Sequence, residues 1–215
     1  TIAAILTVGI PTIVMNGIGS VMNFGMNQIL QGFTETATSV FGIYYKLQSF
    51  FFMPVFGLNG SVVPIISYNF GAGYKKRLLK AVRIGVIFAE VLMITGTVVF
   101  ELFPATLIRI FDPDIVEIGV PALRIIGVHF PVAAVCIILG TVFQALGHGI
   151  YSTWVSIARQ LLVLLPAAYL LSLSGNLTMV WFAFPIAEVI SLTLTLIFYG
   201  IVYKKTISHV GEEKA

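Results

Sequence analysis

Residues 47–74, LQSFFFMPVFGLNGSVVPIISYNFGAGY, contain no charged side chain, and this stretch decides the class of the fold. It is 28 residues long, whereas about 20 apolar residues are enough for a helix to cross a membrane. A second uncharged run, 125–158, is longer still. Of the 215 residues, 58% are hydrophobic and only 10% are charged, and the mean hydropathy is +1.02. Because a soluble domain carries charges at about a quarter of its positions, the composition excludes a water-soluble fold and predicts an integral membrane protein.

The uncharged runs divide the chain into six predicted membrane-spanning helices. Pro11 and Pro121 suit the first turn of a helix, and Gly73 and Gly147 suit the turns between helices. The apolar runs do not alternate with polar residues, which disfavours a transmembrane β-barrel. We therefore expect an all-α integral membrane protein, a six-transmembrane-helix bundle over residues 1–205 that is followed by a cytoplasmic tail at 206–215. The helices are expected at about 10–32, 37–66, 83–102, 120–144, 152–173 and 178–203.

Lysine and arginine side chains gather after two of these helices. They are Lys75, Lys76, Arg77, Lys80 and Arg83 after the second helix, and Lys204 and Lys205 after the sixth. Because such residues stay on the cytoplasmic side, we expect a multi-pass protein of the plasma membrane with both termini in the cytoplasm. This topology explains the net charge of +3 and the pI near 9.0, so no nucleic-acid partner is expected. The chain opens with Thr1 and shows no signal segment, which favours a piece of a longer protein or a processed chain.

Sequence motifs for catalysis, cofactors and metals are absent. The single cysteine, Cys136, excludes an internal disulfide framework and a four-thiolate metal site. There is no HExxH, GxxxxGK[ST] or GxSxG motif, and residues 71–73 (GAG) lack the third glycine of a dinucleotide-binding loop. We therefore expect no enzyme activity, no bound cofactor and no metal site.

A polar stripe follows one face of the first predicted helix. Its members lie within an arc of about 80° on a helical wheel, and they are Asn16, Ser20, Asn23, Asn27 and Gln31. Amide groups need hydrogen-bond partners, which hydrocarbon does not provide. The stripe therefore faces either a neighbouring helix, to which it hydrogen-bonds, or a water-filled cavity. Since it runs the length of the span, we favour the cavity.

A lysine lies deep in the second predicted helix. Lys46 is about 15 Å from the start of this span at 1.5 Å per residue, and Phe50 and Met53 follow it on the same side. A cation beside an adaptable apolar surface suits bulky amphipathic ligands, so these residues are candidates for a substrate cavity. The alternative is that Lys46 extends to the membrane surface. Gln144, at the end of the fourth predicted helix, is a further candidate for the cavity.

Three more charges fall inside predicted spans, where ionisable groups are functional candidates by default. Arg159 and Glu188 lie at similar depths in two antiparallel helices joined by a short turn, so they can form an ion pair. The pair is either structural or part of a proton relay. Glu90, near the middle of the third predicted helix, has no obvious partner in the sequence and is a second candidate for proton binding.

Several stretches resemble the multidrug and toxic compound extrusion (MATE) transporters. They are residues 46–54 (KLQSFFFMP), 56–60 (FGLNG), 64–73 (PIISYNFGAG), 142–147 (VFQALG), 158–160 (ARQ) and 185–188 (PIAE). The likeness extends from about Gly9 to Lys205 and is to the second of two six-helix lobes. It implies one lobe of a twelve-helix transporter in a bacterial inner membrane that works by alternating access. It further implies export of cationic or amphipathic drugs against a proton or sodium gradient, with an N-terminal six-helix lobe or a second copy as partner.

One departure from the family concerns coupling. Sodium-coupled relatives carry an acid on the first helix of this lobe and another on the fourth, whereas this chain has Gly19 and Ser20 in the first region and no acid in the fourth helix. Coupling is therefore expected in the other lobe, or at Glu188 or Glu90. Two other functions stay open: a flippase for lipid-linked saccharides, which would favour a more basic cavity, and a non-transporting membrane subunit or a channel.

Overall fold

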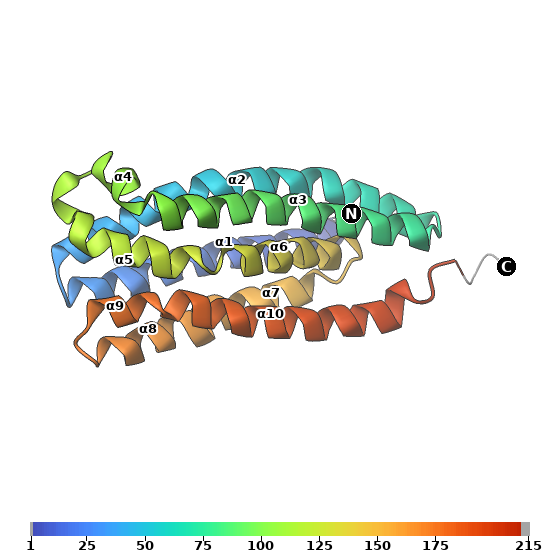
Figure 1. Cartoon of the computed structure of the whole chain (residues 1–215). Coiled ribbons are helices and arrows are strands. Elements are labelled where there is room, and N and C mark those ends of the chain that lie inside the picture. Colours follow the sequence, from blue (N-terminus) through green and yellow to red (C-terminus); the bar gives the residue numbers. More distant parts are fainter. Residues whose placement is uncertain (1, 212–215) are drawn as a thin grey trace.

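A computed structural model of the chain describes the backbone of residues 2–211 and the side chains of Ile13 and residues 17–211. Over this range the chain is helical, with no β-strand (Figure 1). Long helices run side by side along one axis, and short helices turn the chain at the end opposite the C-terminus. The long helices are α1 (Ile2–Gln31), α2 (Glu35–Gly71), α3 (Lys75–Leu102), α5 (Val116–Gly127), α6 (Phe130–Ala145), α7 (Gly149–Ile157), α8 (Leu165–Ser172) and α10 (Ala183–Val202). The short elements are α4 (Pro104–Arg109), η1 (Pro113–Ile115), α9 (Leu177–Trp181) and two π-helical segments, η2 (Ala158–Leu164) and η3 (Tyr203–Ile207).

By length and composition, four helical stretches of the described residues can cross a membrane: Glu35–Gly71, Lys75–Leu102, Gly149–Ser172 and Leu177–Ile207. Two consecutive helices, Pro113–Gly127 and Phe130–Ala145, qualify together as a fifth, with a bend of 47° between them. The first predicted span, 10–32, lies in α1, where most side chains before Gly17 are outside the described residues, so the sixth span stays a prediction.

The helix limits differ from the predicted ones in a consistent way. The helix predicted at 37–66 continues to Gly71, and the one predicted from residue 83 already begins at Lys75. The predictions stopped where the apolar residues stop, but backbone hydrogen bonds continue a helix into the polar region until a residue such as Gly73, at φ 75°, ends it. Helical structure likewise continues to Ile207, into the predicted tail, of which residues 212–215 are outside the described residues.

The helix predicted at 120–144 is divided into α5 and α6. The division falls at Val128 and His129, just before Pro131 in the first turn of α6. Proline lacks the backbone N–H that would continue the helix, and its ring collides with the preceding turn. The His129 ring nitrogen Nδ1 hydrogen-bonds the Ile126 carbonyl at this break. The bend therefore turns His129 inward, where it is buried.

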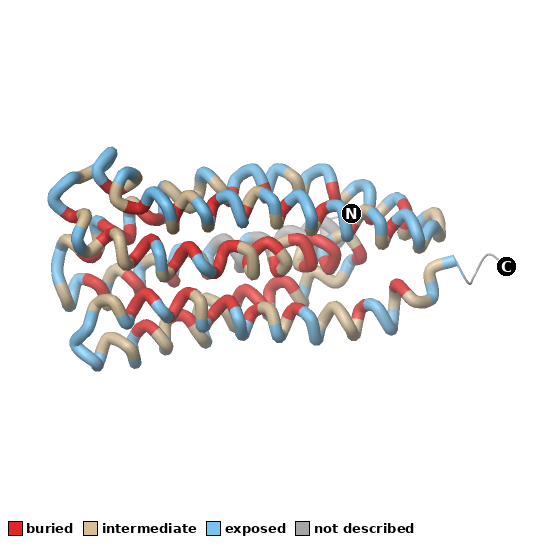
Figure 2. The backbone as a smooth tube through the Cα atoms, viewed as in Figure 1, coloured by how far each residue is buried: buried red, intermediate tan, exposed pale blue. Residues whose placement is uncertain are grey.

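Burial is greatest in the middle of the bundle, and α6 is buried along most of its length (Figure 2). One core cluster is aromatic: the ring centroid of Phe130 is 5.0 Å from that of Phe100 and 5.3 Å from that of Phe52. The outer faces carry large exposed apolar side chains, such as Phe88 and Val91 on α3. Such faces suit hydrocarbon, as expected for membrane-spanning helices.

Candidate functional site

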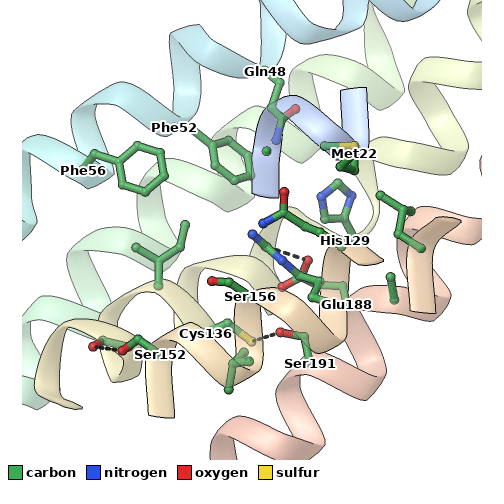
Figure 3. Close-up of a pocket in the computed structure, with 18 of the residues that line it drawn as sticks. Met22, Gln48, Phe52, Phe56, His129, Cys136, Ser152, Ser156, Glu188 and Ser191 are labelled. Atoms are coloured by element: carbon green, nitrogen blue, oxygen red, sulfur yellow. Dashed lines mark hydrogen bonds and ion pairs between the residues drawn. The ribbon is translucent and has the colours of Figure 1, made fainter. Parts of the chain in front are cut away.

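A cavity of about 680 Å³ opens between α1, α2, α6, α7, η2 and α10 (Figure 3). Its volume is within the range of small-molecule binding sites. The lining combines aromatic rings with amide and hydroxyl groups. From the described residues, its main side chains are Ser20, Met22, Asn23, Tyr44, Tyr45, Gln48, Ser49, Phe52, Met53, Phe56, Asn59, His129, Cys136, Thr141, Gln144, Ser152, Ser156, Arg159, Gln160, Phe184, Glu188, Ser191 and Thr195.

Five amide side chains of this lining have no side-chain hydrogen bond within the described part of the chain. They are Asn23 of α1, Gln48 and Asn59 of α2, Gln144 of α6 and Gln160 of η2. Each amide group offers two donors and an acceptor. The cavity therefore presents unused hydrogen-bonding capacity on several walls, next to the apolar rings of Phe52 and Phe56.

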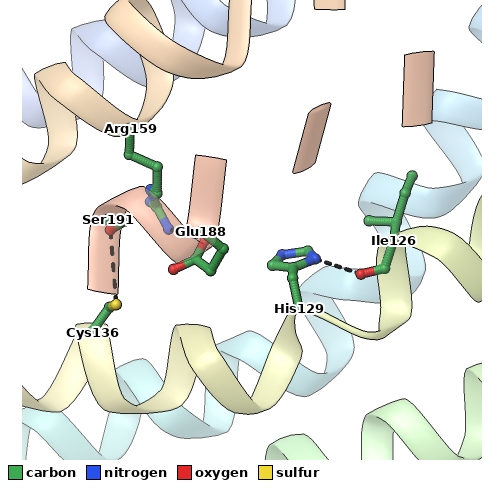
Figure 4. Close-up of polar contacts among 6 residues, drawn as sticks. All are labelled: Ile126, His129, Cys136, Arg159, Glu188 and Ser191. Carbon is green, nitrogen blue, oxygen red and sulfur yellow. Dashed lines mark hydrogen bonds and ion pairs between the residues drawn. The ribbon is translucent and has the colours of Figure 1, made fainter. Parts of the chain in front are cut away.

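An ion pair joins two of the walls. Arg159 of η2 donates from Nη1 to Oε2 of Glu188 on α10, at 3.3 Å (Figure 4). The two partners differ in exposure: 29% of the Arg159 side chain is exposed, against 4% of the Glu188 side chain. The second carboxylate oxygen of Glu188, Oε1, is buried and has no hydrogen-bond partner among residues 17–211. The ion pair that the sequence allows is thus present, and its cation is the more exposed of the two partners.

Weaker polar contacts surround this pair. Ser191, three residues after Glu188, hydrogen-bonds the Cys136 thiol with 3.8 Å between Oγ and Sγ (Figure 4). Ser152 donates to the Gly140 carbonyl at 2.8 Å. In the part of the chain that the structure describes, no three His, Cys, Asp or Glu side chains are grouped so that they could hold a metal ion. The two hydrogen bonds, from Ser191 and from Ser152, join α6 to α10 and to α7.

The segment that carries Arg159 is a π-helix. Arg159 and Gln160 belong to η2, which lies just before Pro166 in the first turn of α8. π-helical turns are rare and frequently occur at functional sites. Both side chains line the cavity although they are adjacent in sequence, so this turn brings a cation and an amide to the same wall.

Four of the residues predicted for the cavity are in its lining: Ser20, Asn23, Met53 and Gln144. Arg159 and Glu188, predicted as a possible ion pair or proton site, line it as well. The stripe on the first helix therefore faces a cavity over Ser20 and Asn23. Asn27, one turn further along α1, does not line it, and the Asn16 side chain lies outside the described residues. Whether these residues bind a substrate stays a prediction.

Two residues predicted for the cavity, Lys46 and Phe50, are not in its lining, and neither is Glu90, the candidate for proton binding. Their roles in binding substrate or protons stay predictions. Met53 does line the cavity, and at about 100° per residue Lys46 lies only about 20° from it on the helical wheel. Lys46 and Phe50 are therefore at the edge of the lining face of α2 rather than opposite it. The Lys46 ammonium group is 6.0 Å from the ring centroid of Phe111, beyond the end of α4, which fits the alternative that this side chain extends to the surface. Glu90 is on α3, which is outside the lining.

Other polar walls were missed although the sequence carries a signal for them. Ser152, Ser156 and Arg159 are spaced by four and three residues, and Glu188, Ser191 and Thr195 by three and four. These intervals place each set on one helical face, as with the stripe on α1. Applied to every span, the same rule would have predicted three polar walls instead of one.

Cysteine labelling tests which face of α1 is accessible to water. In a Cys136→Ala background, a cysteine at Asn23 is expected to react with a membrane-impermeant maleimide about ten times faster than one at Asn27, because a thiol must be reached by water to ionise and react. A cysteine at Phe50 is the matched control on an apolar face. Equal reaction rates at positions 23 and 27 would contradict the prediction that Asn23 faces a water-filled cavity and Asn27 does not.

Known proteins resemble this chain in sequence. A profile of the MatE family matches residues 11–170. The multidrug export protein MepA of Staphylococcus haemolyticus is 28% identical over 200 residues, which cover 89% of this chain and 42% of that protein. The chain thus spans less than half the length of the curated relatives it matches.

Two solved structures share the fold. They are the inward-facing and the outward-facing conformation of a multidrug resistance MATE family transporter of the MOP superfamily, each with a TM-score of 0.87 and 19% identity. The first match covers 100% of this chain and 50% of that one, and the second covers 97% and 47%. Because the family profile matches well over half of the chain, the chain belongs to the MatE family, the multidrug and toxic compound extrusion (MATE) transporters.

Proposed function

We propose that this chain is the C-terminal lobe of an exporter that moves amphipathic compounds out of the cell by alternating access. The observation that carries the proposal is the cavity, in which unpaired amide groups lie beside the aromatic rings of Phe52 and Phe56. Such a mixture suits compounds with an apolar body and a polar group. We infer that both termini lie in the cytoplasm, because the basic clusters share one side, and that the membrane is a bacterial inner membrane, as the family resemblance implies.

Rocking of two lobes around a central site is the expected mechanism. It requires that each lobe keep its shape while the relative position of the lobes changes. The equal TM-scores against the inward-facing and outward-facing structures support a lobe of this kind. The partner is then an N-terminal six-helix lobe, or a second copy of this one, and the driving force is a proton or sodium gradient. The Arg159–Glu188 pair is a candidate for coupling, as is a carboxylate of the partner lobe.

A dye-efflux assay tests the function. Cells that express the protein from its complete coding region are loaded with ethidium, Nile red or dansylglycine, which are cationic, neutral and anionic fluorescent compounds. We expect gradient-dependent efflux of at least one of them, lost with nigericin and valinomycin for proton coupling or with monensin at constant pH for sodium coupling. Release that persists without any gradient would indicate a channel, and no release above empty-vector cells would indicate a non-transporting subunit.

The flippase alternative receives less support from the cavity. A lipid-linked pyrophosphate needs several basic groups, whereas Arg159 is the single lysine or arginine in the described lining and is already paired with Glu188. Transport of a lipid-linked saccharide, with no efflux of the three dyes, would reverse this preference.

A further inference from the structure

Two charged side chains that line the cavity differ in how far they are exposed. Of the two charged side chains in the described lining, Arg159 is partly exposed and Glu188 is almost completely buried. The free carboxylate oxygen, Glu188 Oε1, is also buried, so a ligand in the cavity does not reach it. A ligand therefore meets the guanidinium first, although the pair as a whole is neutral.

Most of the hydrogen-bonding capacity of Arg159 is unused. A guanidinium has five N–H donors in one plane, and Nη1 makes the hydrogen bond that the structure records, to Glu188 Oε2. At 3.3 Å this contact is longer than the 2.7–2.9 Å usual for charged pairs. The remaining donors match the two oxygens of a carboxylate, sulfonate or phosphate group.

The neighbouring side chains complete a site for an amphipathic anion. The amide groups of Gln160, Asn23 and Gln48 offer further donors. The rings of Phe52 and Phe56 form an apolar wall of the same cavity (Figure 3). A compound with an aromatic body and an acidic group can therefore place its body on the rings and its acid on Arg159.

Building on the function proposed above, we propose that this lobe selects amphipathic compounds with an anionic or strongly accepting group, and that Arg159 is the residue that binds that group. A cationic compound gains nothing comparable, because the carboxylate lies behind the guanidinium. The lobe then differs in substrate class from the cationic drugs that the family resemblance implies.

Binding of three dansyl compounds to the purified, full-length protein in detergent tests this selection. Dansylglycine is an anion, its methyl ester is neutral, and dansylcadaverine is a cation, so the fluorophore is constant while the charge varies. From the strength of a charge-assisted hydrogen bond, we expect dansylglycine to bind about ten times tighter than either of the others. Equal affinities, or a preference for dansylcadaverine, would overturn the proposal.

Variants of the ion pair give opposite expected changes. Arg159→Gln is expected to weaken dansylglycine binding about tenfold and to leave the methyl ester unchanged. Glu188→Gln is expected to strengthen dansylglycine binding, because the guanidinium loses its competing acceptor. A loss of folding produces neither a charge-selective change nor a gain, so the second variant keeps the test valid if the first is poorly folded. Arg83→Gln, at an exposed position of α3 outside the cavity lining, is the matched control and leaves all three affinities unchanged.

The outcomes separate the substrate class from the transport function. Gradient-driven efflux of ethidium combined with charge-independent binding would disprove the role of Arg159 and leave the exporter intact. Selective binding of dansylglycine without efflux of any dye would disprove the exporter and leave the anion site. If Glu188→Gln weakens dansylglycine binding as much as Arg159→Gln does, the pair is structural and the proposal is wrong.

Discussion

Replacing Arg159 by glutamine is expected to lower the free energy of unfolding by about 3 kcal/mol. The substitution leaves the carboxylate of Glu188 buried without its cation, and breaking a buried ion pair from one side typically costs about 3–5 kcal/mol. The Glu188 side chain is 4% exposed, so water cannot replace the lost partner. Denaturant unfolding of the purified protein in detergent micelles, followed by tryptophan fluorescence, measures the change.

The difference in exposure between Arg159 and Glu188 provides controls for this prediction. Glu188→Gln is expected to cost less, because the 29% exposed guanidinium of Arg159 can turn to water in the cavity. The double variant, with glutamine at both positions, is expected to recover part of the loss, since no unpaired charge remains buried. Arg124→Gln breaks the exposed contact of Arg124 with Glu101, at 4.0 Å, and is expected to change stability by less than about 1 kcal/mol. Equal costs at Arg159 and Arg124 would mean that the pair with Glu188 is as well hydrated as a surface pair.

Replacing Phe100 by alanine is expected to destabilise the lobe by about 3 kcal/mol, as truncation of a buried phenylalanine does in other cores. Phe100 is fully buried, and its ring centroid lies 5.0 Å from that of Phe130, 5.9 Å from Phe51 and 6.5 Å from Tyr44. The substitution opens a cavity where α2, α3 and α6 meet. The same unfolding experiment measures the loss.

The matched control for this substitution lies three residues away. Phe103 follows the end of α3 and is 54% exposed, so Phe103→Ala removes the same atoms from a position with few packing partners. Its expected effect is less than about 1 kcal/mol. A similar loss at both positions would show that the aromatic cluster contributes no specific packing energy.

The ion pair and the aromatic cluster support the cavity from different sides. Arg159 and Glu188 connect η2 to α10, while Phe100 and Phe130 connect α3 to α6. Phe52 belongs to both regions, because it lines the cavity and its ring centroid is 5.3 Å from that of Phe130. Changes in the cluster are therefore expected to affect ligand binding through the position of Phe52.

Periodicity within one helix predicted part of the site. Ser20 and Asn23 lie toward the cavity because a stripe at intervals of three and four residues defines one face, and amide groups cannot face lipid. The same reasoning grouped Lys46 and Phe50 with Met53 on α2, but of these three only Met53 lines this cavity. Periodicity fixes which residues share a face, but it does not fix which neighbour that face meets. The latter depends on how α2 packs against α1 and α6.

The sequence by itself determined the membrane class and the all-α fold. These are local properties, since the length of an apolar run and the chemistry of proline and glycine act within one segment. Only the tertiary structure decided that Arg159 and Glu188, 29 positions apart, meet at 3.3 Å, and that the cation is the more exposed partner. Burial depends on what every neighbouring helix covers, and a single segment carries no record of its neighbours.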